Sequence, residues 1–417
     1  MPPVAQQIAD WFGTLLRGPL AGLRGADPVL GLALMVLAAL VVASVLNRRL
    51  RLPRLLGYLL VGALASPALL DVLQRTDLDP WKPLIDLAVA ALVFELGTRL
   101  RPRWLLDNPW LAASSVLEAA AAAAAVGFTL VMLGAPAASA AAAAALAAAT
   151  SPVITMAALL EARPRGQVAE RLLMLSAINS VLAVLAIKLW PVLAQGVSAA
   201  DSLSLLGSAS AVIFGSVLVG LACGMLLDRL ALLHDDLATM PVLQLALVIL
   251  AALLAIAAGL SPFMTLLVAG MTARSRMRHR LTVEPYLGSA GAALTVMLFV
   301  SFGVLSTVTD LTNLLPWVVA IIVARLIGKG LAIFATARPS GLSWRQAAAL
   351  TLALQPMSSL SVLLVADSFG WRTQLPGADA NVIQALLVAT TLMQLSGPLW
   401  TLLPLKHVVR EADETQK

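Results

Sequence analysis

The stretch A-A-A-T-S-P-V-I (residues 147–154) places two hydroxyl side chains and a proline in the middle of a long apolar run. Proline has no amide hydrogen to donate and clashes with the preceding helical turn, so a helix over residues 138–160 should break at Pro152. A break frees backbone carbonyls and amides, which need partners if the segment lies in a membrane. The stretch therefore predicts a broken helix with polar groups at mid-membrane.

The composition of the whole chain indicates that this setting is a membrane. Of the 417 residues, 60% are hydrophobic and 12% are charged, whereas a soluble domain carries about 25% charged residues. Mean hydropathy is +0.92. The net charge of +6 is spread over short loops and does not suggest binding of nucleic acid. We therefore expect an all-α polytopic membrane protein with little room for a soluble domain.

Runs of apolar residues predict about thirteen membrane-spanning helices, because only helices satisfy their own backbone in a polytopic chain. The expected membrane domain is 28–405, with an interfacial segment over 1–27 and a short tail over 406–417. The expected spans are 29–46, 54–70, 83–99, 109–133, 138–160, 170–195, 204–228, 240–257, 260–274, 288–305, 313–336, 344–366 and 383–404.

Basic residues gather in alternate loops, as at 48–54 and 274–280, while the loops between them carry acids such as Asp71 and Asp79. The positive-inside rule places the basic loops in the cytoplasm. The sequence thus predicts a plasma (inner) membrane protein with its N-terminus outside and its C-terminus in the cytoplasm. It also predicts contact with membrane lipid.

Matched positions in the two halves of the chain suggest an internal repeat. A second break is expected at Q-P-M-S-S (residues 355–359). Chance similarity between glycine-rich apolar helices explains any one match, but three matches in order favour two inverted repeats, 29–195 and 240–404, joined by a linking helix over 204–228. The matched pairs are Gly62 and Gly270, Gly97 and Gly303, and Pro152 and Pro356, which are 208, 206 and 204 residues apart.

Ionisable residues inside membrane spans are rare and usually functional. Arg325 and Lys329 are four residues apart on one helix face, so these cations need acidic or dipolar partners. For each residue a structural ion pair is the alternative, and Lys188 is better explained by snorkelling to the outer interface. The deep candidates are Glu95, Glu118, Lys188, Arg325 and Lys329.

Four motifs, in this order, resemble the monovalent cation:proton antiporter superfamily, which includes the Kef-type and Na⁺/H⁺ exchanger proteins. The resemblance covers roughly residues 30–404. The motifs are R-L-P-R-L-L-G-Y-L-L-V-G-A-L-A-S-P (51–67), F-E-L-G (94–97), A-T-S-P (149–152) and L-I-G-K-G (326–330).

The resemblance implies an ion site where the broken helix meets the sixth helix, and a homodimer. The family carries Asn-Asp or Asp-Asp on the sixth helix, but here S-A-I-N-S (176–180) gives Asn179-Ser180 and the carboxylate is missing. Oxygen ligands for a hard cation could still come from five residues. These residues are Thr150, Ser151, Ser176, Asn179 and Ser180.

None of those five side chains exchanges a proton, so proton coupling needs another group. Glu95 matches the glutamate of the exchangers and is the first candidate, with Glu118 second. Arg325, at the family's arginine position, or Lys329 would balance charge, and Gln355 at the second break is a further candidate.

The sequence therefore predicts a secondary transporter that exchanges Na⁺ or K⁺ for H⁺ by alternating access, without a cofactor. No H-E-x-x-H, G-x-S-x-G or Walker motif suggests an enzyme. Two alternatives stay open. One is proton-uncoupled transport of an anion or neutral solute, because Arg325, Lys329 and Lys188 could make the site positive. The other is a non-transporting relative that acts as a sensor or partner.

Overall fold

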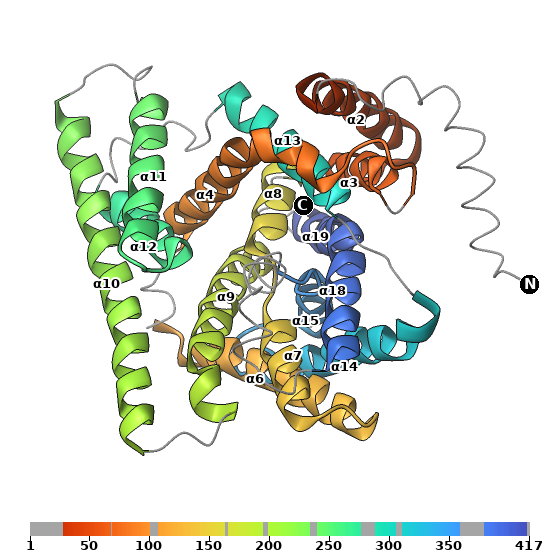
Figure 1. Cartoon of the computed structure of the whole chain (residues 1–417), viewed down its shortest axis with the longest axis vertical. Coiled ribbons are helices and arrows are strands. Elements are labelled where there is room, and N and C mark those ends of the chain that lie inside the picture. The colour runs from red at the N-terminus through yellow and green to blue at the C-terminus, as the bar shows by residue number, and fades with distance from the viewer. Residues whose placement is uncertain are drawn as a thin grey trace, which may run out of the picture. The chain divides into compact units, whose positions relative to one another are not determined.

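The computed structural model describes the chain as an assembly of helices (Figure 1). The residues it describes are 28–67, 69–100, 107–162, 166–194, 199–233, 240–276, 288–305, 311–358 and 379–414. The expected interfacial segment 1–27 lies outside them. Over the described ranges the only β-pairing is one isolated bridge between Thr150 and Met357, so the predicted all-helical fold is confirmed.

The helices follow the expected spans closely in order and position. Their bounds are α2 Pro28–Leu50, α3 Arg54–Ala65, α4 Lys82–Arg99, α6 Pro109–Met132, α7 Ala137–Ala148, α8 Pro152–Ala162, α9 Gln167–Ala194, α10 Ala199–Leu232, α11 Met240–Ala257, α12 Pro262–Arg276, α13 Gly288–Val304, α14 Leu311–Ala337, α15 Trp344–Ala353, α18 Ala380–Leu395 and α19 Gly397–Glu414, with a short 3₁₀ helix, η2, at Arg75–Trp81.

By length and hydropathy alone, five described helices could each cross a membrane, or six if the bent pair α18–α19 is one span. Four shorter apolar helices, α3, α7, α8 and α13, lie in expected spans as well. Breaks such as the one between α7 and α8 divide a span into two short helices, which lowers this number. The count of thirteen spans stays a prediction.

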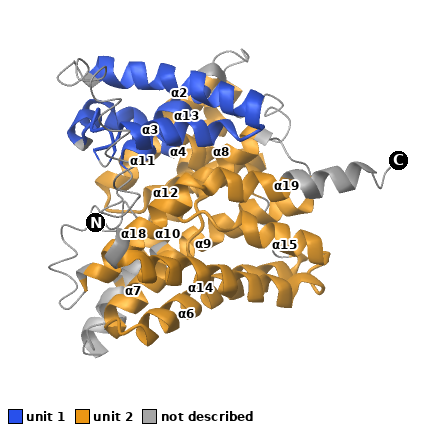
Figure 2. Cartoon of the chain, turned by 90° about the vertical axis from the view of Figure 1, so that its right-hand side faces the viewer, with its two compact units in different colours: residues 1–89, 289–311 blue, residues 90–288, 312–417 orange. Residues whose placement is uncertain are grey.

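The chain divides into two compact units, shown in different colours in Figure 2. One unit comprises residues 1–89 and 289–311, and the other comprises 90–288 and 312–417. In the first unit α3 crosses α13 at Gly62 and Gly303. A Cβ on Gly62 would lie 2.0 Å from the carbonyl oxygen of Val300, and one on Gly303 would lie 2.3 Å from that of Leu59. Only glycine permits this approach.

In the second unit α4 crosses α12 in the same manner. A Cβ on Gly97 would lie 2.3 Å from the carbonyl oxygen of Leu267, and one on Gly270 would lie 2.2 Å from that of Phe94. The positions that the sequence matches across the halves thus exchange partners between the two crossings. The two inverted repeats themselves stay a prediction. The expected linking helix, α10, packs along α12 in the same unit (Figure 1).

The predicted helix break at Pro152 is present, because α7 ends at Ala148 and α8 begins at Pro152. Its backbone finds partners at the second break. The amide of Ser151 donates to the carbonyl of Pro356 at 2.9 Å, and the Thr150 hydroxyl donates to the carbonyl of Leu354 at 3.0 Å. The two interrupted segments therefore lie side by side and satisfy each other's polar backbone. The second segment continues into residues outside the described ranges.

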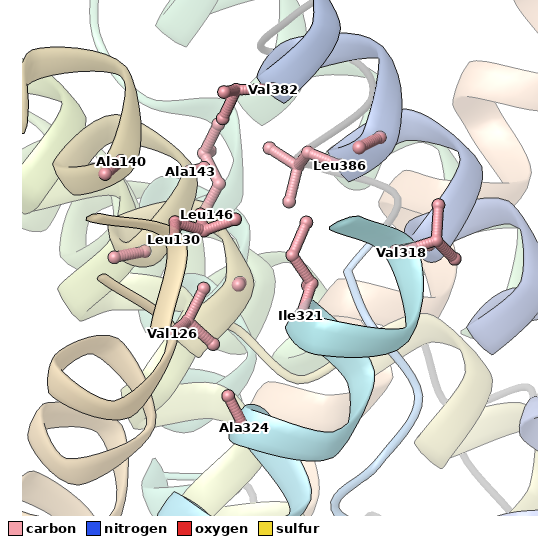
Figure 3. Close-up of a cluster of buried hydrophobic side chains, with 14 of the residues drawn as sticks. Val126, Leu130, Ala140, Ala143, Leu146, Val318, Ile321, Ala324, Val382 and Leu386 are labelled. Carbon is pink, nitrogen blue, oxygen red and sulfur yellow. The ribbon is translucent and has the colours of Figure 1, made fainter. Parts of the chain in front are cut away.

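A buried apolar cluster packs beside this crossing (Figure 3). It joins α6, α7, α14 and α18, and the alanine-rich α7 lets its neighbours approach closely. Ala324 of the cluster directly precedes Arg325, and Leu146 directly precedes Ala147. The cluster therefore shields one side of the charged residues described next. Its labelled members are Val126, Leu130, Ala140, Ala143, Leu146, Val318, Ile321, Ala324, Val382 and Leu386.

Candidate ion-binding site

Arg325 of α14 is completely buried and binds the carbonyls at the end of α7. Its Nε donates to the carbonyl of Ala147 at 2.5 Å, and its Nη2 donates to that of Ala149 at 2.9 Å and to the Thr150 hydroxyl at 3.4 Å. Its Nη1 donates to both the backbone and side-chain oxygens of Gln355, at 2.6 and 3.2 Å. All five guanidinium donors are used, and the positive charge sits at the negative end of a half-helix.

Lys329, one helical turn further on, is also completely buried. Its ammonium forms an ion pair with Oε1 of Glu118 from α6. It also donates to the carbonyl of Ala148 at 3.0 Å and to the Thr150 hydroxyl at 3.1 Å. These contacts account for all three ammonium donors.

The pair between Lys329 and Glu118 depends on a close approach of α14 to α6. A Cβ on Gly328 would lie 2.5 Å from the carbonyl oxygen of Ala121 on α6. Glu118 is one turn before Ala121, so glycine at 328 allows its carboxylate to reach the ammonium. In the motif L-I-G-K-G (326–330) glycines flank Lys329 and permit a close helix approach, but the motif does not say which helix makes it.

Asn179 of α9 lies on the other side of the Glu118 carboxylate. Its Nδ2 donates to Oε2 of Glu118 at 2.6 Å. The side-chain oxygen of Asn179 is buried and has no hydrogen-bond partner in the described part of the chain. An unpartnered buried acceptor is costly, so this atom is a natural ligand for a bound cation or a donor.

Ser180 and Ser176 bring α9 against the break. The Ser180 hydroxyl contacts the carbonyls of Thr150, at 3.2 Å, and Ser176, at 2.9 Å. The Ser176 hydroxyl donates to the carbonyl of Leu173 at 2.9 Å. Ser151 caps α8, because its Oγ accepts from the amide of Ile154 at 3.2 Å. The hydroxyl candidates therefore gather around Thr150, although each already has a backbone partner.

The charges and free hydrogen-bonding groups of this cluster bear on whether it could bind a cation or an anion. Arg325 and Lys329 carry positive charge, Glu118 carries negative charge, and the carbonyl end of α7 adds roughly half a negative charge. The donors of both cations are all occupied by protein atoms. The unpartnered group of Asn179 is an acceptor. The cluster therefore has an acceptor available for a cation and no free Arg325 or Lys329 donor for an anion.

The structure shows a partner for Glu95, whereas the snorkelling expected for Lys188 stays a prediction. Oε1 of Glu95, on α4, accepts from Nη2 of Arg99 on the same helix at 2.8 Å, and Arg99 is partly exposed. The carboxylate seen between Lys329 and Asn179 is that of Glu118, the second candidate from sequence. Lys188 lies in α9, but its side chain is outside the described residues.

Arg171 makes a buried contact that the sequence did not single out. This buried arginine is near the start of α9 and donates to the carbonyl of Ser340, just beyond α14. It therefore ties the helix of Asn179 to the end of the helix of Lys329. Burial of an arginine is not readable from sequence, because Arg171 falls beside a basic loop and looks like a topology signal.

The helix break at Pro152 pairs with the residues after α15 and lies beside buried charges. This arrangement is typical of integral membrane proteins of the secondary-transporter class. The sodium/hydrogen exchanger transmembrane family matches residues 35–402. The chain belongs to this family, whose members are transporters and not enzymes, and the resemblance seen in its motifs is confirmed.

Solved structures show the same fold. The sodium proton antiporter MjNhaP1 from Methanocaldococcus jannaschii at pH 8 superimposes with a TM-score of 0.69 at 16% identity, over 92% of this chain and 97% of that chain. An electron-microscopy structure of the same antiporter gives a TM-score of 0.69 at 18% identity, over 92% of this chain and 95% of that one. No curated protein sequence matches the chain significantly.

Proposed function

We propose that the protein exchanges a monovalent cation, Na⁺ or K⁺, for H⁺, and that Glu118 is the carboxylate that couples the two. The observation that carries this proposal is the position of Glu118, completely buried between Lys329 and Asn179 beside the crossed breaks. Family membership and the antiporter fold support the exchange itself. A transport assay with each cation would distinguish Na⁺ from K⁺ as the substrate.

The coupling follows from the chemistry of one carboxylate. Glu118 can hold a proton or neutralise a monovalent cation, and occupancy by one disfavours the other. Asn179 Oδ1 and the nearby hydroxyl oxygens of Thr150 and Ser180 would complete the coordination of a hard cation. Lys329 competes for the same carboxylate, so it keeps the buried charge paired when the cation has left. In this proposal Glu118 takes the role that the sequence assigned first to Glu95.

A proton-uncoupled anion carrier has less support, because Arg325 and Lys329 have no donor left for an anion. The alternating movement of one helical bundle, the homodimer and the cytoplasmic C-terminus remain part of the proposal. They rest on the family's fold and on the distribution of basic loops.

Proteoliposomes loaded with a pH-sensitive dye test this function. We expect addition of Na⁺ or K⁺ to move protons in wild-type vesicles, and the responses to Na⁺, K⁺ and Li⁺ to rank the cations. Glu118→Gln should abolish the response, whereas Glu95→Gln, the matched control, should retain most of it. A full response from Glu118→Gln together with a silent Glu95→Gln would return the coupling role to Glu95. A silent wild type with anion-dependent currents would support the anion carrier, and silence in every assay would support a non-transporting relative.

A further inference from the structure

One side of α14 is apolar and exposed along most of the helix, while the other side holds the buried charges. The exposed side chains recur every three or four residues, which places them on one helix face. Arg325 and Lys329, on the opposite side, are completely buried. The exposed residues, called the α14 stripe below, are Val319, Val323, Ile327, Leu331 and Phe334.

At its C-terminal end the α14 stripe meets an aromatic pair, Phe334 and Trp344, and the side chain of Arg338. The rings of Phe334 and Trp344 stack with their centroids 5.9 Å apart and their planes 14° apart. Trp344 is 50% exposed. The guanidinium carbon of Arg338 lies 5.2 Å from the centroid of the Trp344 ring. The backbone carbonyl of Arg338 accepts from the amide of Gly341. Within the described part of the chain the Arg338 guanidinium has no hydrogen bond or ion pair, so its donors remain available.

These features together match one kind of ligand. An apolar stripe accommodates acyl chains, and a tryptophan beside it is typical of the headgroup level of a membrane. A guanidinium with free donors binds a phosphate oxygen pair well, and stacking on an aromatic ring fixes its orientation. The segment R-P-S-G-L-S-W-R (338–345) carries two arginines and no acid. A net negative headgroup therefore suits it better than a zwitterionic one.

We infer that an anionic phospholipid binds at this end of α14, with its phosphate on Arg338 and its acyl chains along the α14 stripe. The same helix holds Lys329 against Glu118. Occupancy by the lipid therefore restrains the helix that carries the buried charges, and anionic lipid stabilises the protein. This inference concerns lipid recognition and holds whichever ion is transported.

Thermal unfolding of the full chain in detergent tests the inference, with dioleoyl phosphatidylglycerol and dioleoyl phosphatidylcholine as the added lipids. We expect phosphatidylglycerol to raise the Tm of the wild type by about 2 °C more than phosphatidylcholine does. Arg338→Gln should lose this difference. Arg276→Gln removes an exposed arginine at the end of α12 and serves as the matched control. It should keep the difference.

Three results would overturn the inference. The difference between lipids could persist in Arg338→Gln, or it could vanish equally in Arg276→Gln, which would indicate only a general effect of surface charge. The third result concerns a second copy of the chain as the occupant of the stripe. Since Cys223 is the single cysteine, Leu331→Cys in a Cys223→Ser background should form no disulfide crosslink between copies under oxidation. A disulfide-linked dimer through residue 331 would assign the stripe to a protein interface. Unfolding of Arg338→Gln in phosphatidylcholine at the wild-type Tm shows that the variant is folded.

Discussion

At the scale of the residue, the central feature of the candidate site is the Glu118 carboxylate, which belongs to α6 and not to α9. The sequence resemblance implies that Ser180 occupies the family's aspartate position, and a serine side chain carries no charge. Glu118, from α6, instead brings a carboxylate against the neighbouring Asn179. An isolated carboxylate would be very costly to bury, but the Glu118 carboxylate is paired with the Lys329 ammonium and accepts a hydrogen bond from the Asn179 amide. We propose that Glu118 supplies the function of the missing aspartate.

Lys329→Met should destabilise the protein by about 3 kcal/mol, because it leaves the Glu118 carboxylate buried without its counter-ion. The double variant Lys329→Met with Glu118→Gln removes both charges, so it should recover part of the loss. Thermal unfolding in detergent measures both effects. If the losses from the two single changes simply add in the double variant, the pair contributes no coupling energy and our account of the cluster is wrong.

Ser180→Asp should restore cation-dependent proton movement to the silent Glu118→Gln variant. The new carboxylate lies on α9, one residue from Asn179, and close to the Thr150 carbonyl that Ser180 contacts now. The same vesicle assay checks this, with Ser176→Asp on the Glu118→Gln background as the control for adding a charge elsewhere on α9. A double variant that unfolds at the wild-type Tm but stays silent would contradict the proposed exchange of roles between helices.

At the scale of the element, glycines and helix breaks decide which groups meet. The crossings of α3 with α13 and of α4 with α12 each use a pair of glycines whose backbones touch. The two interrupted segments exchange hydrogen bonds at Ser151 and Thr150, so neither break leaves these polar groups unsatisfied. Close helix contact through small residues is the usual way to gain packing energy in a membrane.

Gly328→Ala should destabilise the protein by about 1–3 kcal/mol and weaken transport, because the added Cβ would lie 2.5 Å from the Ala121 carbonyl oxygen and push α14 away from α6. Gly330→Ala is the matched control on the same helix. Its Cβ would meet only the Cγ2 of Thr351, at 3.4 Å, which is an ordinary contact. The Tm and the initial transport rate are measured for both variants. Equal losses in Gly328→Ala and Gly330→Ala would show that the close approach at Gly328 is unimportant.

Arg171→Gln should raise the cation KM several-fold while changing the maximal rate less. The reason is that Arg171 fixes α9, with Asn179, to the carbonyl of Ser340 beyond α14, with Lys329. Arg171→Lys keeps one donor and should recover part of the affinity. A purely structural role for Arg171 would lower the Tm of Arg171→Gln and leave its KM unchanged.

At the scale of the whole molecule, the chain has the fold of an antiporter despite only 16–18% identity to MjNhaP1. Apolar composition and the spacing of hydrophobic runs tolerate much substitution, because lipid selects for hydrophobicity more than for identity. The distribution of basic residues among the loops, which predicts the orientation in the membrane, also tolerates substitution because only the charge matters. The predicted orientation is therefore testable over the full chain.

Cysteines introduced at exposed loop positions should be labelled from opposite sides of the membrane. In a Cys223→Ser background, Arg276→Cys lies in a predicted cytoplasmic loop and Asp79→Cys in a predicted outer loop, and both residues are exposed. A membrane-impermeant maleimide should label the cysteine at 79 in right-side-out vesicles and the one at 276 only in inside-out vesicles. The reverse result would invert the topology.

The sequence by itself determined the membrane class, the helical order, the family and the break at Pro152. These features depend on local composition and on proline chemistry, which act within one segment of chain. It also identified the deep charges, including Glu118, as a short set of candidates. The match between the two halves singled out four glycines, and the structure places these glycines at helix crossings.

Only the tertiary structure decided between Glu95 and Glu118 as neighbours of Lys329 and Asn179. The choice depends on how closely α14 approaches α6 at Gly328, a contact between residues more than two hundred positions apart. Periodicity places a residue on a helix face, but it does not say which helix that face meets. The same holds for Arg171, whose burial follows from the position of Ser340 and from nothing in its own segment.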